Sequence, residues 1–203
     1  MYTDTEGEHA VRMARAAIEA YTRGDPLPPV SVPASFEKEC GVFVTINRHP
    51  TGELRGCIGY PTPMFPLAKA IVKAAEGATE DPRFPKLPVE ELVGVVVEVS
   101  ILTPPELLTA KKPKQLLAQV RIGTDGLIAA QSRQRGLLLP QVPVEWGWGV
   151  EEFLAQTCMK ADLMPDAWLD PDTRIYRFQS VIWTEVEPNG PVVRRVLNAH
   201  ARP

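Results

Sequence analysis

The sequence predicts an α+β fold from two amphipathic helices, one alternating strand and the order of the elements. Apolar residues at helical spacing form one continuous face in residues 9–23 and another in residues 150–161. Valine at every second position from 93 to 99 indicates a strand with one face in the core. The predicted order of helix, hairpin, helix, strands, helix and strand fits a mixed α+β fold better than a regular βαβ alternation.

The N-terminal half of the chain predicts a helix, a hairpin and a second helix. The first helix, residues 9–23, ends before a glycine, and the four prolines of residues 25–35 then indicate an extended connector. Apolar runs at 41–47 and 54–60 flank the turn-forming segment RHPTGE, which predicts a hairpin. Residues 67–79 carry the apolar face of the second helix.

The C-terminal half is predicted to contain more strands than helices. Its clearest element is the alternating strand at 93–101, which follows a loop rich in proline. The further predicted elements are a helix near Gln115, short strands at 120–122 and 127–130 joined through 124–126, an apolar run at 137–139, the helix at 150–161 and a strand pair or one long strand at 174–186.

Size and composition restrict the class of protein. A chain of 203 residues with 44% hydrophobic residues is long enough for one substantial core, so we expect a single domain over residues 1–203. No stretch approaches the ~20 consecutive apolar residues that cross a bilayer, and the first ten residues lack a signal-peptide pattern, so we expect a cytoplasmic protein. Frequent proline and scarce asparagine are typical of a thermophilic source.

The cysteines and the net charge exclude some kinds of site. Cys40, Cys57 and Cys158 are widely spread and form no C-x-x-C pair, which disfavours a disulfide framework and a thiolate zinc site. We therefore expect free thiols. A net charge of -3 provides no general positive field for nucleic acid, which makes that partner less expected without excluding it.

The segment LRGCIG, residues 54–59, contains the strongest candidate site. Alternation along a strand places Arg55 and Cys57 on one face, about 7 Å apart at their Cα atoms. A guanidinium at this distance lowers the pKa of a thiol, and Gly56 and Gly59 leave room for a ligand or another backbone. The alternative is that Cys57 is a small buried residue under close packing, as most free cysteines are.

The few histidines disfavour two familiar chemistries. The chain has only His9, His49 and His200, and His49 is expected in the hairpin turn, on the order of 10 Å or more from Cys57. A cysteine–histidine dyad and a histidine metal site are therefore disfavoured. The carboxylates show no metal-loop spacing, so we expect neither a metal nor a cofactor.

Glu98 is the third candidate catalytic residue, beside Cys57 and Arg55. It lies among valines on the predicted strand, where an ionised carboxylate is costly unless paired, and Arg83 or Arg55 could be its partner. One interpretation is a general acid or base with a shifted pKa, and the other is a structural ion pair. Asp81 is expected to cap a turn, with Arg83 anchoring the loop.

A second candidate region is the rigid aromatic segment at residues 138–148. Its Gln141, Glu145 and Trp146 could line a pocket or stack on a base. The alternative is that the tryptophans of this segment cover the edge of a core. Cys158 lies on the apolar face of its helix and is predicted to be a packed core residue.

Four segments, taken together and in order, resemble the AMMECR-one domain family: GVFVTIN with LRGCIGY, then DPRF, then VEVSILTPPEL, and last GLLLPQVPVEWGW leading into FLAQTCMKADL. The similarity covers nearly the whole chain, although Asp162 stands where the family usually has glycine. The resemblance implies an antiparallel sheet flanked by helices, with a larger and a smaller lobe in one domain and LRGCIG near the groove between them. It implies no established reaction.

Three classes of function follow from these features. The leading hypothesis is an enzyme or small-ligand binder with a groove centred on Cys57 and Arg55. The alternatives are a nucleic-acid or nucleotide-binding module that uses the basic and aromatic loops, and an adaptor that docks a protein. The expected partner is a small molecule or a protein, with no membrane. Only nucleic-acid binding requires phosphate contacts, and it should weaken steeply with salt.

Overall fold

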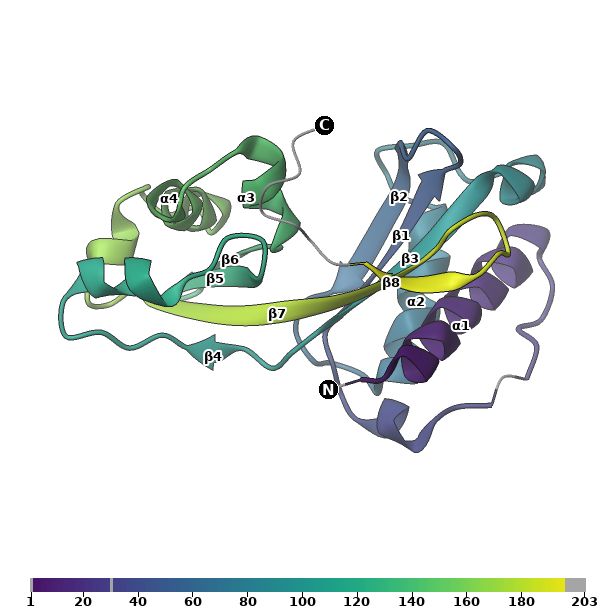
Figure 1. The fold of residues 1–203 in the computed structure, drawn as a ribbon, viewed down its shortest axis with the longest axis horizontal. Coiled ribbons are helices and arrows are strands. Elements are labelled where there is room, and N and C mark those ends of the chain that lie inside the picture. Colours follow the sequence, from purple (N-terminus) through teal and green to yellow (C-terminus); the bar gives the residue numbers. More distant parts are fainter. Residues whose placement is uncertain (1, 30, 196–203) are drawn as a thin grey trace. The chain divides into compact units, whose positions relative to one another are not determined.

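The computed structural model describes residues 2–29 and 31–195. Of these residues, 2–102 and 181–195 form one compact unit, called unit 1, and 103–180 form another, called unit 2. Both units combine helices with antiparallel strands, which confirms the predicted α+β class and the antiparallel sheet flanked by helices. The long strand β7 (Arg174–Glu185) supplies residues to both units (Figure 1).

Unit 1 is an antiparallel sheet with two helices packed on one face (Figure 1). Its strands are β1 (Val42–Arg48), which pairs with β2 (Leu54–Tyr60) and β3 (Val95–Leu102), and β8 (Val192–Arg195), which pairs with the end of β7. The helices are α1 (Asp4–Arg23) and α2 (Leu67–Thr79), and the 3-10 turns are η1 (Ala34–Glu37) and η2 (Val89–Gly94). Helices and strands share one apolar core.

Helix α1 begins five residues before the predicted start, because its first turn is fixed by a cap and not by apolar spacing. The Thr3 hydroxyl accepts a hydrogen bond from the N–H of Glu6, and the Glu6 carboxylate accepts from the N–H of Thr3 over 2.7 Å. This reciprocal arrangement satisfies two N–H groups that the helix leaves unpaired. The predicted end is confirmed, since Gly24 adopts φ 76° and caps the last turn.

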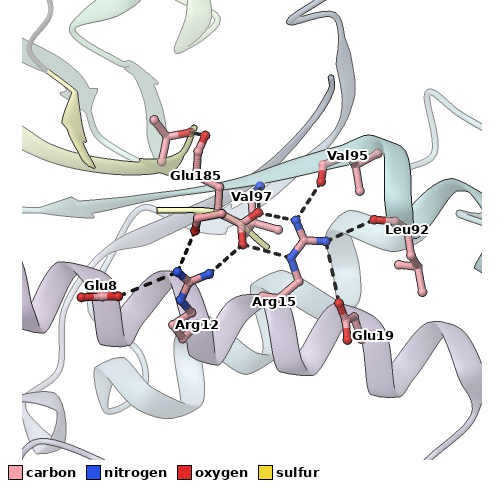
Figure 2. A network of polar contacts seen from close by, with 10 residues as sticks. Glu8, Arg12, Arg15, Glu19, Leu92, Val95, Val97 and Glu185 are labelled. Atoms are coloured by element: carbon pink, nitrogen blue, oxygen red, sulfur yellow. Dashed lines mark hydrogen bonds and ion pairs between the residues drawn. The ribbon is translucent and has the colours of Figure 1, made fainter. Parts of the chain in front are cut away.

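A buried charge network joins α1 to the strands of unit 1 (Figure 2). The Glu185 carboxylate is fully buried and accepts hydrogen bonds from Arg12, Arg15 and the N–H of Val97. The Arg15 guanidinium is also buried and donates to the carbonyl of Val95 over 2.7 Å. Each buried charge is thus paired with an opposite charge and with the backbone, as burial in a core requires.

Unit 2 surrounds a second apolar core. Its strands are β5 (Asp125–Gln131), which pairs with β6 (Gln134–Leu138) and the start of β7, and β4 (Glu106–Leu107), which pairs with β7. Its helices are α3 (Gln141–Trp146) and α4 (Val150–Lys160), and its 3-10 turns are η3 (Pro113–Gln119) and η4 (Ala167–Leu169). Phe153, Leu154 and Cys158 of α4 are fully buried, which confirms the predicted apolar face and the packing of Cys158.

Two predicted elements differ from the structure. Residues 120–122 form no strand, because the buried carboxylate of Asp125 accepts the N–H of Arg121 over 2.9 Å and closes a turn before β5 begins. β5 pairs with β6 instead. The alternating strand begins at Val95 and not at 93, because η2 continues to Gly94 and leaves Val93 81% exposed. Among the described residues, no helix is long and apolar enough to cross a membrane.

Candidate functional site

Cys57 lies in the middle of β2, in a row of three side chains that crosses the sheet of unit 1. The strand register places Cys57 opposite Thr45 of β1, and Thr45 opposite Glu98 of β3. Directly opposed residues of antiparallel strands share a face of the sheet, so these three side chains are neighbours. The Thr45 hydroxyl lies 3.3 Å from the Cys57 sulfur and donates a hydrogen bond to it.

Arg55 is not the ion partner of Cys57 that the sequence predicts. Ile46 opposes Gly56 and Asn47 opposes Leu54, so Arg55 is the extra residue of a β-bulge. A bulge interrupts the alternation of side chains, and the spacing of two residues therefore no longer determines a shared face. The Arg55 guanidinium is buried and donates to Glu91 over 2.8 Å.

Burial raises the pKa of the Cys57 thiol, so the predicted lowering is wrong. The hydrogen bond from Thr45 and the positive charge of Arg83 favour the thiolate, while the negative charges of Asp81 and Glu98 oppose it. Desolvation is the largest of these effects. The thiol is consequently protonated at neutral pH.

Asp81 and Arg83 hold the backbone of Cys57 from the side away from β1. The Asp81 carboxylate accepts the N–H of Cys57 over 2.8 Å, and it accepts from Arg83 Nη2 over 2.7 Å and Nε over 3.0 Å. Arg83 Nη2 also reaches the carbonyl of Cys57, at 3.5 Å. The hydrogen bonds from Arg83 hold the pKa of Asp81 far below its usual range. Asp81 is buried, whereas the Arg83 side chain is 56% exposed.

Asp81→Asn should lower the free energy of unfolding by about 1.5 kcal/mol at pH 7, because the ion pair with Arg83 is lost and the amide NH2 cannot accept the hydrogen bonds that one carboxylate oxygen accepts. The lowered pKa means that the carboxylate stabilises the fold above the pKa of an unfolded aspartate, near 4, and loses this effect as the pH falls through the folded pKa. Urea unfolding should therefore show the two proteins converging below about pH 4. Asp25→Asn, on the surface, is the control. An equal difference at pH 7 and pH 3 would contradict the assignment.

Glu98 has a different ion partner from either predicted one. Its buried carboxylate accepts a hydrogen bond from Arg195 Nη1 over 2.9 Å. Arg83 is bound to Asp81 and Arg55 to Glu91, so neither predicted arginine takes this place. Glu98 remains a neighbour of the Cys57 sulfur through the row at Thr45.

The two glycines beside Cys57 serve close packing and do not leave open space. A Cβ atom on Gly56 would lie 2.1 Å from the carbonyl oxygen of Ala78 in α2. A Cβ atom on Gly59 would lie 2.4 Å from the ring of Phe43. At Gly59 the Phe43 ring and the backbone carbonyl of Val42 occupy this space, so the alternative of a close backbone is confirmed and that of room for a ligand is wrong.

The residues predicted on the aromatic segment all lie on α3 of unit 2. Trp146 is 70% exposed and stacks on Trp148, with ring centroids 5.9 Å apart and planes 18° apart. Gly147, at φ 66°, turns the chain between the two rings. The Gln141 side-chain oxygen is buried and has no hydrogen-bond partner within the described part of the chain. Glu145 belongs to the same short helix.

Within unit 1 the structure thus brings Cys57 together with Arg83 and Glu98, whereas Arg55 pairs with Glu91. Sequence reasoning missed Thr45 and the direct bond from Asp81 to the backbone of Cys57. The contact between Thr45 and Cys57 can be predicted from the hairpin only if the strand register is known, and the bulge changes that register. His200 lies outside the described residues.

Comparison with known proteins identifies a family, two relatives and a solved structure. The AMMECR1 family model matches residues 11–183. Protein PYRAB00100 of Pyrococcus abyssi is 52% identical over 200 residues, covering 96% of this chain and 97% of that protein. Protein MJ0810 of Methanocaldococcus jannaschii is 52% identical over 198 residues, covering 97% and 98%. The crystal structure of uncharacterized protein PH0010 from Pyrococcus horikoshii superposes with a TM-score of 0.87 at 50% identity, over 96% of this chain and 98% of that one.

Proposed function

We propose, from the geometry of unit 1, that this chain, which belongs to the AMMECR1 family, binds a small anionic ligand at Cys57, beside Arg83. The names of its relatives specify no activity. One observation carries the proposal. The buried carboxylate of Asp81 bonds both to the backbone of Cys57 and to Arg83, and so fixes a half-exposed guanidinium next to the thiol.

An anion suits this guanidinium better than a cation or a neutral group. The Asp81 carboxylate accepts hydrogen bonds from Nε and Nη2 of Arg83, while Nη1 makes no hydrogen bond to any residue that the structure describes. A guanidinium held through Nε and Nη2 can still donate from Nη1 to a carboxylate or a phosphate. Because burial raises the pKa of Cys57, the adjacent thiol is neutral and does not repel an anion.

Cys57 is the one cysteine of the three that a ligand can contact. Cys40 and Cys158 are buried, whereas Cys57 is partly exposed. A reaction through Cys57 would first require loss of its proton, which the raised pKa opposes. Binding is therefore the function that this geometry supports most directly. A nucleic acid needs several phosphate contacts, and a single anchored guanidinium offers too few.

The proposal predicts that an anionic thiol reagent is preferred at Cys57. The Cys57 thiolate is the nucleophile that displaces iodide from both iodoacetate and iodoacetamide, so the ratio of the two rates cancels the effect of the thiol pKa. Arg83→Gln should lower the iodoacetate-to-iodoacetamide ratio by about twofold to fivefold, since an exposed charge pair contributes about 0.2–1 kcal/mol. Brief labelling followed by mass spectrometry of the Cys57 peptide gives both rates.

Arg23→Gln removes the same charge from the end of α1 and should leave the ratio unchanged. Both rates should reach half of their maximum at a higher pH than for a free cysteine, because the pKa of Cys57 is raised. A ratio that Arg83→Gln leaves at the wild-type value would refute anion binding at this position.

A further inference from the structure

Unit 2 contains a cavity of about 410 Å³ between η3, η4 and the segment that follows β4. Three buried side chains form its apolar part: Leu108, Leu116 and Trp168. Leu107, which is 44% exposed, adds an apolar wall toward solvent. The volume lies within the roughly 300–1,000 Å³ that is typical of small-molecule sites.

The charged groups at this cavity are mainly cationic. Lys111 and Arg174 line it and are exposed, and neither forms an ion pair with another described residue. Asp170 also lines it, but its carboxylate is engaged by the Gln131 side chain over 3.2 Å and by the N–H of Asp172 over 2.9 Å. An apolar interior with two unpaired cations therefore complements a ligand that has an apolar body and a negative end.

We propose that this cavity binds a small monocarboxylate with an apolar tail. The tail would lie against Leu108, Leu116 and Trp168, where it gains the free energy of apolar burial. The carboxylate would lie toward Lys111 and Arg174, which remain in water and need no desolvation of a buried charge. This site involves residues of unit 2 alone and is independent of ligand binding at Cys57.

A second hollow of unit 2 serves as an internal comparison. It measures about 580 Å³, shares Asp170 with the cavity, and is lined by Asp162 and Asp166 but by no lysine or arginine. Its charge is opposite, so it would favour an amine over a carboxylate. Probes that differ only in the charge of the head group can therefore distinguish the two hollows.

The test is an NMR titration of the full chain with octanoate and with octylamine at pH 7, following the indole N–H signals of the tryptophans. The Trp168 signal, assigned by its loss in Trp168→Phe, should shift saturably with octanoate and not with octylamine. The double variant Lys111→Gln/Arg174→Gln should weaken octanoate binding about fivefold to tenfold, as expected for the loss of two exposed charge interactions. Lys112→Gln/Arg133→Gln removes two other surface cations and should leave the affinity unchanged.

Three results would overturn the proposal: no saturable shift of Trp168 with octanoate, equal binding of octylamine, or an affinity that the double variant does not change. Thermal unfolding of each variant, compared with the control pair, verifies that any lost binding does not come from an unfolded unit 2.

Discussion

Glu185→Gln should lower the free energy of unfolding by about 3–5 kcal/mol, the usual cost of removing one partner of a buried ion pair. The substitution keeps the shape of the side chain but removes the buried counter-charge of the Arg15 guanidinium, which is 4% exposed, and leaves it only the more distant carboxylate of Glu19, at 4.0 Å. It also weakens the acceptor for the N–H of Val97. Urea unfolding followed by circular dichroism measures the loss.

Glu8→Gln is the matched control for this substitution. Glu8 pairs with Arg12 at the exposed end of the same network, over 3.8 Å, and surface pairs of this kind contribute about 0.2–1 kcal/mol. The double variant Arg15→Met/Glu185→Met should recover part of the loss, because it removes both buried charges together. If Glu185→Gln cost no more than Glu8→Gln, the network in Figure 2 would not be a significant source of stability.

Gly56→Ala should lower the free energy of unfolding by about 3 kcal/mol, the upper end of the usual range for overpacking. The added Cβ would lie 2.1 Å from the carbonyl oxygen of Ala78, so β2 and α2 must separate. A backbone atom of a helix cannot move aside as the end of a flexible side chain does. Thermal unfolding and urea unfolding both measure the effect.

Gly94→Ala provides the comparison, since a Cβ at Gly94 meets no atom within 4 Å. It should change the unfolding free energy little, or raise it slightly by restricting the unfolded chain. Similar losses for Gly56→Ala and Gly94→Ala would mean that β2 and α2 do not pack as closely as described. The same result would reopen a role for Gly56 in binding.

Local patterns in the sequence were sufficient to predict most elements of the fold. Helical spacing of apolar residues identified α1, α2 and α4, and it placed Cys158 in a core, where it is fully buried. Alternation identified β3, although not its first residue. These patterns depend on residues that lie close together in the chain, and periodicity reports such residues directly.

The candidate site was harder to predict because its contacts are distant in the sequence or depend on one extra residue. Glu98 pairs with Arg195, 97 positions away, and no local pattern indicates that pair. The bulge at Arg55 shifts the register of one strand by one residue, so the spacing of two residues does not make Arg55 and Cys57 ion partners. The raised pKa of Cys57 depends on the packing around it, which a motif does not specify.

In the described part of the chain, β2 pairs with β1 alone and is therefore the last strand of its sheet. The free N–H and C=O groups of such an edge strand invite pairing with strands of other molecules. At Cys57, Asp81 accepts the N–H and Arg83 donates toward the carbonyl, so two side chains take the place of a neighbouring backbone. At Cys57 the pair consequently protects the edge from aggregation by strand addition, while the thiol itself remains partly exposed.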